Sequence, residues 1–175
     1  MGSINLQASL EMNLKELRLQ TILKHYSQYA REIIEENSSY EQYLYLLTDK
    51  ELDVRYNRRV KDLLRTANFP REKKLSDFNF DTISAIRKEV ILELCQGHFL
   101  NDNSNIVMFG PPGTGKTHLS IAIGRELCLK RKKVIFFTGC SLVQELNRAK
   151  KNLTLTKTFK KLSGFDLVII DELGY

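Results

Sequence analysis

The chain has 175 residues, is 42% hydrophobic and carries a formal net charge of +6, so it is large enough to bury a core. Its three cysteines, Cys95, Cys128 and Cys140, are an odd number without C-x-x-C spacing, which argues against a disulfide framework or a zinc site and favours small buried residues. No apolar run reaches the ~20 residues of a membrane span, and Met1–Asn5 resembles no signal peptide, so we expect a cytoplasmic protein without a membrane partner.

Residues 1–70 predict an all-helical N-terminal domain. Apolar residues recur at helical spacing from Leu19 to Ile33. Capping patterns at 38–42 and 48–51 then predict two further helices, the second with Leu52 on its apolar face. The basic face of this helix includes Arg58 and Arg59, for which DNA contact and plain solvation are equally good interpretations.

Residues 71–81 form the predicted linker, and residues 82–175 the predicted nucleotide-binding core. The core starts with a helix over 82–99 and continues with strands at 106–109, 134–138 and 166–170. Helices are predicted over 116–130, 141–150 and near 156–162. Because strands and helices alternate, we expect an α/β fold with a three-layer core around a parallel sheet.

A complete phosphate-binding loop separates strand 106–109 from the following helix, because its residues match G-x-x-x-x-G-K-[ST]. Backbone N–H groups of such a loop, together with the positive end of the helix dipole, bind phosphate oxygens. Lys116 would contact the β- and γ-phosphates, and Thr117 would ligate Mg²⁺. The predicted loop residues are Gly110, Pro111, Pro112, Gly113, Thr114, Gly115, Lys116 and Thr117.

Two further residues belong to the predicted nucleotide site. For His118, directly after the loop, a packing or surface role is favoured over a ligand role. Phe80 in the linker is a candidate to pack against adenine, with anchoring of the linker to the core as the alternative.

The run Leu167–Ile170 predicts a strand buried on both faces, and it ends in Asp171-Glu172. Ligands of open α/β sheets bind at the carboxyl ends of strands, so Asp171 is expected to hold Mg²⁺. Glu172 is expected to activate the attacking water and, with Lys116, forms the predicted catalytic pair.

Basic residues are concentrated between 130 and 161, where Glu145 is the single acid. Such a local charge favours polyanions, with a solvated helix face as the alternative. The predicted DNA-binding residues here are Arg148, Lys150, Lys151, Lys157, Lys160 and Lys161.

The chain resembles the IstB-like branch of the AAA+ ATPases. The resemblance rests on the loop with Thr117-His118-Leu119, on the stretch from Val168 to Tyr175, and on the helical front module. Three shorter stretches, 14–19, 56–59 and 77–80, also match. The resemblance implies ATP hydrolysis with Mg²⁺, self-association into a ring or spiral on duplex DNA, and assistance to the transposase of the same insertion sequence in target selection.

Other interpretations remain open. A DnaC-like replicative helicase loader has the same chemistry and a different partner, whereas a small-molecule kinase is disfavoured by Glu172 and by the basic stretch. A DNA-binding module that nucleotide merely stabilises is a third alternative. Because the sequence ends at Tyr175 with three predicted strands instead of about five, we expect a truncated core without sensor or arginine finger, and hydrolysis by this chain alone is in doubt.

Overall fold

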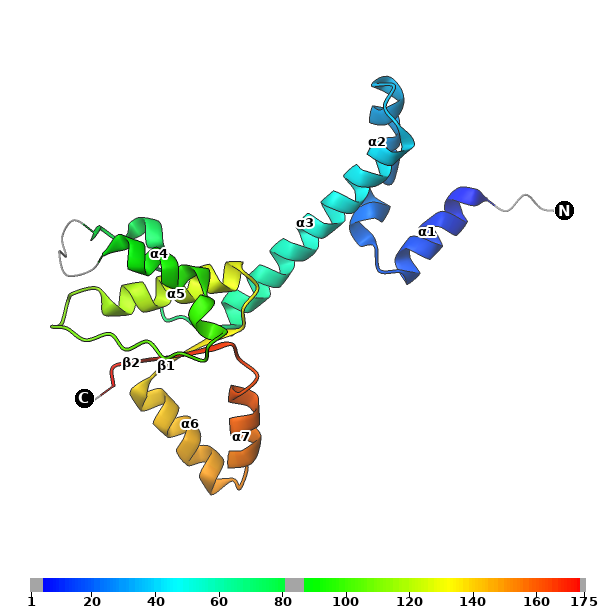
Figure 1. The fold of residues 1–175 in the computed structure, drawn as a ribbon. Coiled ribbons are helices and arrows are strands. Elements are labelled where there is room, and N and C mark those ends of the chain that lie inside the picture. The colour runs from blue at the N-terminus through cyan, green and yellow to red at the C-terminus, as the bar shows by residue number, and fades with distance from the viewer. Residues whose placement is uncertain (1–4, 81–86, 174–175) are drawn as a thin grey trace. The chain divides into compact units, whose positions relative to one another are not determined.

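A computed structural model describes residues 5–80 and 87–173 (Figure 1). The chain divides into two compact units, residues 1–59 and 60–175. The expected start of the helix at 82–99 and the end of the chain at 174–175 lie outside the described residues. No helix in the described ranges is both long and apolar enough to cross a membrane.

The described part of the first unit contains helices only. These are α1 (Leu6–Glu16), α2 (Gln20–Glu35) and the first part of α3 (Tyr40–Thr66). Glu51 of α3 is 6% exposed, and its Oε2 accepts hydrogen bonds from the backbone N–H groups of Thr21 (3.0 Å) and Ile22 (3.3 Å). Its Oε1 binds Arg55 Nε at 2.7 Å. A buried carboxylate on α3 thus caps the N-terminus of α2, the end of a helix that favours negative charge.

The predicted helix boundary near Thr48 and the predicted inward, apolar face for Leu52 are both wrong. The hydroxyl of Thr48 donates to the carbonyls of Leu44 (2.9 Å) and Tyr45 (3.0 Å) within one continuous helix, instead of capping a new one. Leu52 is 65% exposed, whereas its neighbour Glu51 is buried. The capping pattern failed because the Thr48 hydroxyl is satisfied by carbonyls of its own helix, and because Glu51 is used by a tertiary contact with α2.

The second unit is built on a parallel two-stranded sheet of β1 (Val134–Thr138) and β2 (Leu167–Asp171). The register runs from Val134 opposite Leu167 to Thr138 opposite Asp171, so both strands end at the same edge. Helices α4 (Lys88–Gln96) and α5 (Lys116–Leu129) lie on one side of the sheet, and α6 (Gly139–Lys151) and α7 (Leu155–Leu162) on the other (Figure 1). The α/β class with a parallel sheet is confirmed.

Helix α5 forms the centre of the core of this unit. Seven of its residues are buried, so it is apolar around most of its circumference and packs against β1, β2 and α4. Leu63 near the end of α3 and Ala67 directly after it complete the core, because both are buried and the Phe136 backbone N–H donates to the Ala67 carbonyl at 2.8 Å. Short 3₁₀ turns at Leu75–Asp77 (η1) and His98–Leu100 (η3) connect the remaining elements.

Four further details differ from the sequence prediction. Strand β2 is not buried on both faces, because Val168 and Ile170 are 36% and 37% exposed. Residues 106–109 form no strand: the segment pairs with neither described strand, and Val107 and Phe109 are 68% and 91% exposed. Helix α4 ends before Gly97, whose φ of 82° cannot continue a right-handed helix, so the predicted end at residue 99 is wrong. Cys95 and Cys128 are buried as expected, but Cys140 is exposed.

Candidate functional site

The phosphate loop connects the extended segment before it to the N-terminus of α5. Gly113 (φ 79°) and Gly115 (φ 81°) both adopt left-handed backbone conformations, which residues with a Cβ reach at a cost of roughly 1–2 kcal/mol. A Cβ added at Gly113 would meet no atom within 4 Å, so the loop is open there. Gly115 directly precedes α5, whose first residue is Lys116. The loop therefore has the curvature and the helix N-terminus that an anion site needs.

The side chain of Lys116 folds back across the loop. Its Nζ donates to the carbonyl oxygens of Gly110 and Pro111, both at 2.8 Å. The hydroxyl of Thr114 also donates to the Pro111 carbonyl, at 2.9 Å. The ammonium is thus held against the loop by hydrogen bonds to neutral carbonyl oxygens, which a negatively charged phosphate oxygen could replace with stronger ones.

The end of β2 meets the start of α5 through one short hydrogen bond. The Thr117 hydroxyl donates to Asp171 Oδ2 at 2.6 Å, across 54 residues of sequence. A hydroxyl and a carboxylate are hard oxygen ligands of the kind that Mg²⁺ prefers. Together with phosphate oxygens of a bound nucleotide they fit a magnesium ion, and no cluster of three or more His, Cys, Asp or Glu side chains suited to a metal occurs among the described residues.

Glu172, the residue after β2, has an exposed side chain and a positive φ of 57°. Its carbonyl oxygen lies 3.0 Å from the position of a Cβ built on Gly139, the first residue of α6. The ends of both strands therefore approach closely, and the acid follows Asp171 at the sheet edge where ligands of α/β folds bind.

The linker packs along α5 and over the loop. The ring of Phe78 lies against Gly115, since an added Cβ would sit 2.5 Å from Phe78 Cε2. Phe78 also makes edge contacts with the rings of Phe80 (4.8 Å between centroids) and His118 (5.3 Å).

Polar contacts hold the same linker in place. His118 Nε2 is 2.8 Å from the Lys74 carbonyl, and Arg125 binds Glu72 at 2.8 Å. The structure therefore places both His118 and Phe80 in contact with Phe78 at the edge of the loop. Sequence reasoning did not identify the contact between Phe78 and Gly115; the aromatic pair in Asp-Phe-Asn-Phe was its only signal.

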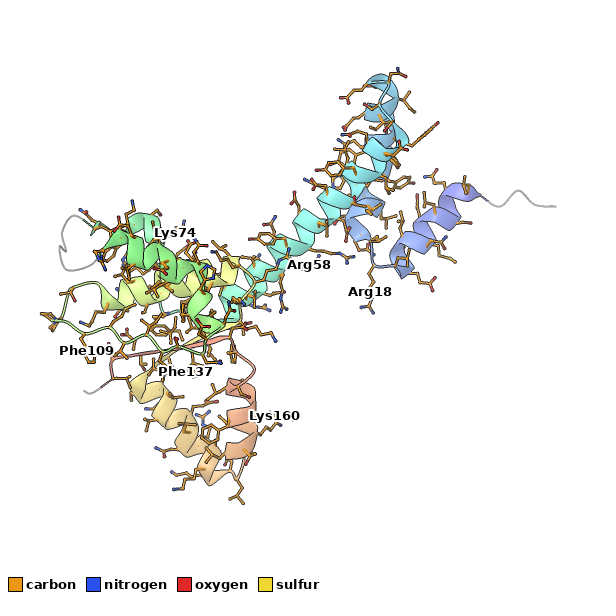
Figure 2. All side chains as sticks on the ribbon, viewed as in Figure 1. Arg18, Arg58, Lys74, Phe109, Phe137 and Lys160 are labelled. Carbon is orange, nitrogen blue, oxygen red and sulfur yellow. The ribbon has the colours of Figure 1, made fainter. Side chains whose placement is uncertain are left out.

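The predicted DNA-binding residues fall on two different units. Arg58 and Arg59 are exposed on α3 in the first unit. The other six are exposed on α6 and α7 in the second unit, and Lys151 among them is the last residue of α6. These two helices form a hairpin, called here the α6–α7 hairpin (Figure 1). Figure 2 places Lys160 on the side of α7 away from α6. None of the six forms an ion pair with a residue in the described ranges.

The sequence of this chain is similar to those of known proteins along almost its whole length. Residues 12–175 match the family of IstB-like ATP binding proteins. The chain belongs to this IstB-like family. An insertion-sequence ATP-binding protein of Sinorhizobium fredii is 36% identical over 170 residues, which cover 97% of this chain and 57% of that protein. The IS232 ATP-binding protein of Bacillus thuringiensis is 34% identical over 98% of this chain and 68% of its own length.

A more distant relationship concerns replication. The replicative helicase loader DnaC of Buchnera aphidicola is 36% identical over 92 residues, which are 50% of this chain and 37% of that protein. The IstB-like chain thus spans about 57% of the first relative and shares a shorter region with the loader. The resemblance of the chain to IstB-like ATP binding proteins is therefore confirmed.

Proposed function

We propose that this chain is the nucleotide-binding part of an AAA+ ATPase that binds ATP with Mg²⁺, assembles on duplex DNA and assists the transposase of its insertion sequence. The observation that carries the proposal is the 2.6 Å contact between Thr117 and Asp171, because it joins the two nucleotide motifs in one site. The free cysteines agree with a cytosolic location, which is part of the proposal.

Each residue of the site has a distinct role in this proposal. The loop N–H groups and the Lys116 ammonium bind the phosphates, and the Thr117 hydroxyl and Asp171 carboxylate hold Mg²⁺. The ion would supply charge neutralisation to the phosphates. Glu172 accepts a proton from water at the end of β2, and Phe78 with Phe80 lines the side of the loop where a base can pack.

Duplex DNA is the proposed macromolecular ligand. This proposal is supported by the α6–α7 hairpin, whose basic side chains are exposed. The nearest acidic residue that precedes them in the sequence is Glu145. Most hydrogen bonds from proteins to DNA go to phosphates and sugars, so exposed lysine and arginine suit this ligand. Assembly of several copies around DNA would bring such hairpins to the same duplex.

The experiment measures ATP binding by isothermal titration with and without Mg²⁺, for the wild type and for Asp171→Asn. We expect Mg²⁺ to strengthen binding to the wild type and to have little effect on Asp171→Asn, because the amide loses the charge that holds the ion. Asp102→Asn, an exposed turn residue, is the matched control. If ATP affinity depended on Mg²⁺ equally in the wild type and in Asp171→Asn, the result would contradict the proposed site.

A helicase loader is the second candidate, favoured by the shared region with DnaC. The two functions use the same nucleotide site and differ in partner. Co-purification of the chain with its cognate transposase, in parallel with the replicative helicase, separates them. Retention of the helicase alone would replace transposition by helicase loading.

A further inference from the structure

The turn between α6 and α7 has an unusual residue at its tip. Helix α6 ends at Lys151 and α7 begins at Leu155, so three residues reverse the chain at the end of the hairpin away from the sheet (Figure 1). The Thr154 N–H donates to the Ala149 carbonyl at 2.8 Å, and the Leu153 N–H to the Lys150 carbonyl at 3.2 Å. This pair of bonds closes the helix with Leu153 in a left-handed conformation, at φ 55°.

Leucine at position 153 lowers the stability of this turn compared with glycine or asparagine. Glycine or asparagine usually occupies it, and another residue in this conformation costs about 1–2 kcal/mol. Among described non-glycine residues with positive φ, three are asparagine and Leu153 is the one aliphatic residue. Packing does not compensate, because Leu153 is 94% exposed. Neither the backbone nor the core of this unit accounts for the side chain.

The surroundings of Leu153 identify the chemistry of its partner. Lys150, Lys151 and Lys157 lie within four residues of it, and no acid occurs from Leu146 to Phe165. A hollow of about 360 Å³ on the same end of α6 is lined by amide and basic side chains: Gln144, Asn147, Arg148, Lys151 and Asn152. Protein interfaces are depleted in lysine, whereas DNA phosphates attract lysine and accept hydrogen bonds from amides. The patch therefore fits a nucleic acid better than an apolar protein surface.

We propose that Leu153 is an apolar wedge that inserts between stacked base pairs of duplex DNA while the neighbouring lysines bind the flanking phosphates. Proteins that kink DNA insert exposed leucine, phenylalanine or methionine side chains in this way. An exposed leucine at a narrow turn can enter a base step that the broader helices cannot. The inference rests on the proposed DNA binding and adds to it a deformation of the duplex by one named residue.

The test uses the full chain and a short duplex that carries the fluorescent base analogue aminopurine, whose emission rises when it is unstacked. The analogue is placed at successive base steps of separate duplexes. We expect the wild type to raise the emission at a subset of steps and Leu153→Gly to lose this rise. Leu153→Met is expected to keep it, because methionine also acts as a wedge.

Two controls separate loss of the wedge from loss of the fold. Leu153→Gly suits the left-handed backbone, so its melting temperature should equal or exceed that of the wild type. Val143→Ala removes another exposed aliphatic side chain from α6, 57% exposed, and should leave the emission unchanged. Sedimentation of each variant without DNA reports self-association.

The outcomes distinguish the wedge from the underlying proposal. Salt-dependent DNA binding by the wild type without a rise in emission, or an undiminished rise with Leu153→Gly, overturns the wedge and leaves DNA binding intact. Absence of salt-dependent binding by the wild type overturns the DNA proposal itself. If Leu153→Gly lowers self-association while emission is retained, Leu153 contacts protein and the inference is wrong.

Discussion

The phosphate loop and the α6–α7 hairpin both present cationic side chains, but they differ in what those cations contact. Lys116 binds two carbonyl oxygens of its own loop. In the hairpin, six basic side chains form no ion pair with any residue of the described ranges. A ligand at the loop must replace existing hydrogen bonds, which favours a group as rich in acceptors as a phosphate. The proposed DNA contact of the hairpin would instead gain affinity from counterion release, which depends on salt and tolerates changes of DNA sequence.

The largest expected effect is on nucleotide affinity. Lys116→Ala should weaken ATP binding by up to about 100-fold, since hydrogen bonds to charged groups contribute about 1.5–3 kcal/mol. Isothermal titration measures the affinity, and the salt dependence of DNA binding should stay unchanged in the same variant. A parallel loss of DNA binding would show that the two regions are not independent.

A second variant tests the buried carboxylate of Glu51 in the first unit, which accepts hydrogen bonds from other groups of the protein. Glu51→Gln should lower the free energy of unfolding by about 1–3 kcal/mol, because the amide is a poorer cap for α2 and loses its charge towards Arg55. Chemical denaturation measures this, with the exposed Glu16→Gln as the matched control. Equal stability of the two variants would mean that the buried carboxylate contributes little.

The same carboxylate predicts a pH dependence. Burial alone would raise the pKa of Glu51, but hydrogen bonds from Arg55 and from the Thr21 and Ile22 amides outweigh it and lower the pKa. A lowered folded pKa gives stability that is present above the unfolded value of about 4.3 and is lost as the pH falls through the folded value. Wild-type stability should therefore decline in that acid range more steeply than that of Glu51→Gln.

Two glycines of the phosphate loop allow backbone strain to be separated from side-chain contact. Gly113→Ala and Gly115→Ala share a similar φ, so each should lose about 1–2 kcal/mol from strain. Only the Cβ at 115 meets Phe78, so Gly115→Ala should be the more destabilised, and Phe78→Ala should reduce the difference. Thermal unfolding of Gly113→Ala and Gly115→Ala, each alone and each combined with Phe78→Ala, measures the difference. Equal losses would indicate that Phe78 moves away at no cost.

The smallest effect is expected for single changes in the hairpin. Lys160→Gln should reduce the slope of log affinity against log salt by about 0.9 if its ammonium binds one phosphate. Fluorescence anisotropy at several salt concentrations measures the slope, with Lys24→Gln on α2 as the control. A slope that equals the control would mean that Lys160 only faces solvent.

Sequence alone predicted the elements whose signal is local. The apolar runs of β1 and β2 and the helices α5, α6 and α7 lie within about two residues of their predicted bounds. The class of fold followed from their alternation. Thr117 and Asp171, which are in contact, each belong to a motif that can be recognised in the sequence. The chemical roles of these two residues stay predictions.

Several of the failures depend on partners distant in sequence, whereas the ends and boundaries of α3 and α4 depend on local hydrogen bonds and backbone angles. Residues 106–109 are apolar, but a strand needs a neighbour to pair with, and no described strand supplies one. Glu51 is buried because the N-terminus of α2 lies beside it, which composition and periodicity do not reveal. The Phe78 contact with Gly115 and the exposed tip residue Leu153 likewise became visible only once the chain was folded.

The close approach at Gly139 restricts which mutations this protein can accumulate. Any other residue there would place its β-carbon 3.0 Å from the carbonyl oxygen of Glu172, and a backbone atom cannot rotate away as a side chain can. In a library randomised at codon 139 and selected for ATP turnover, we expect glycine to be recovered more often than any other residue. The first residue of the hairpin proposed to bind DNA would then be constrained by the backbone of Glu172 and not by DNA.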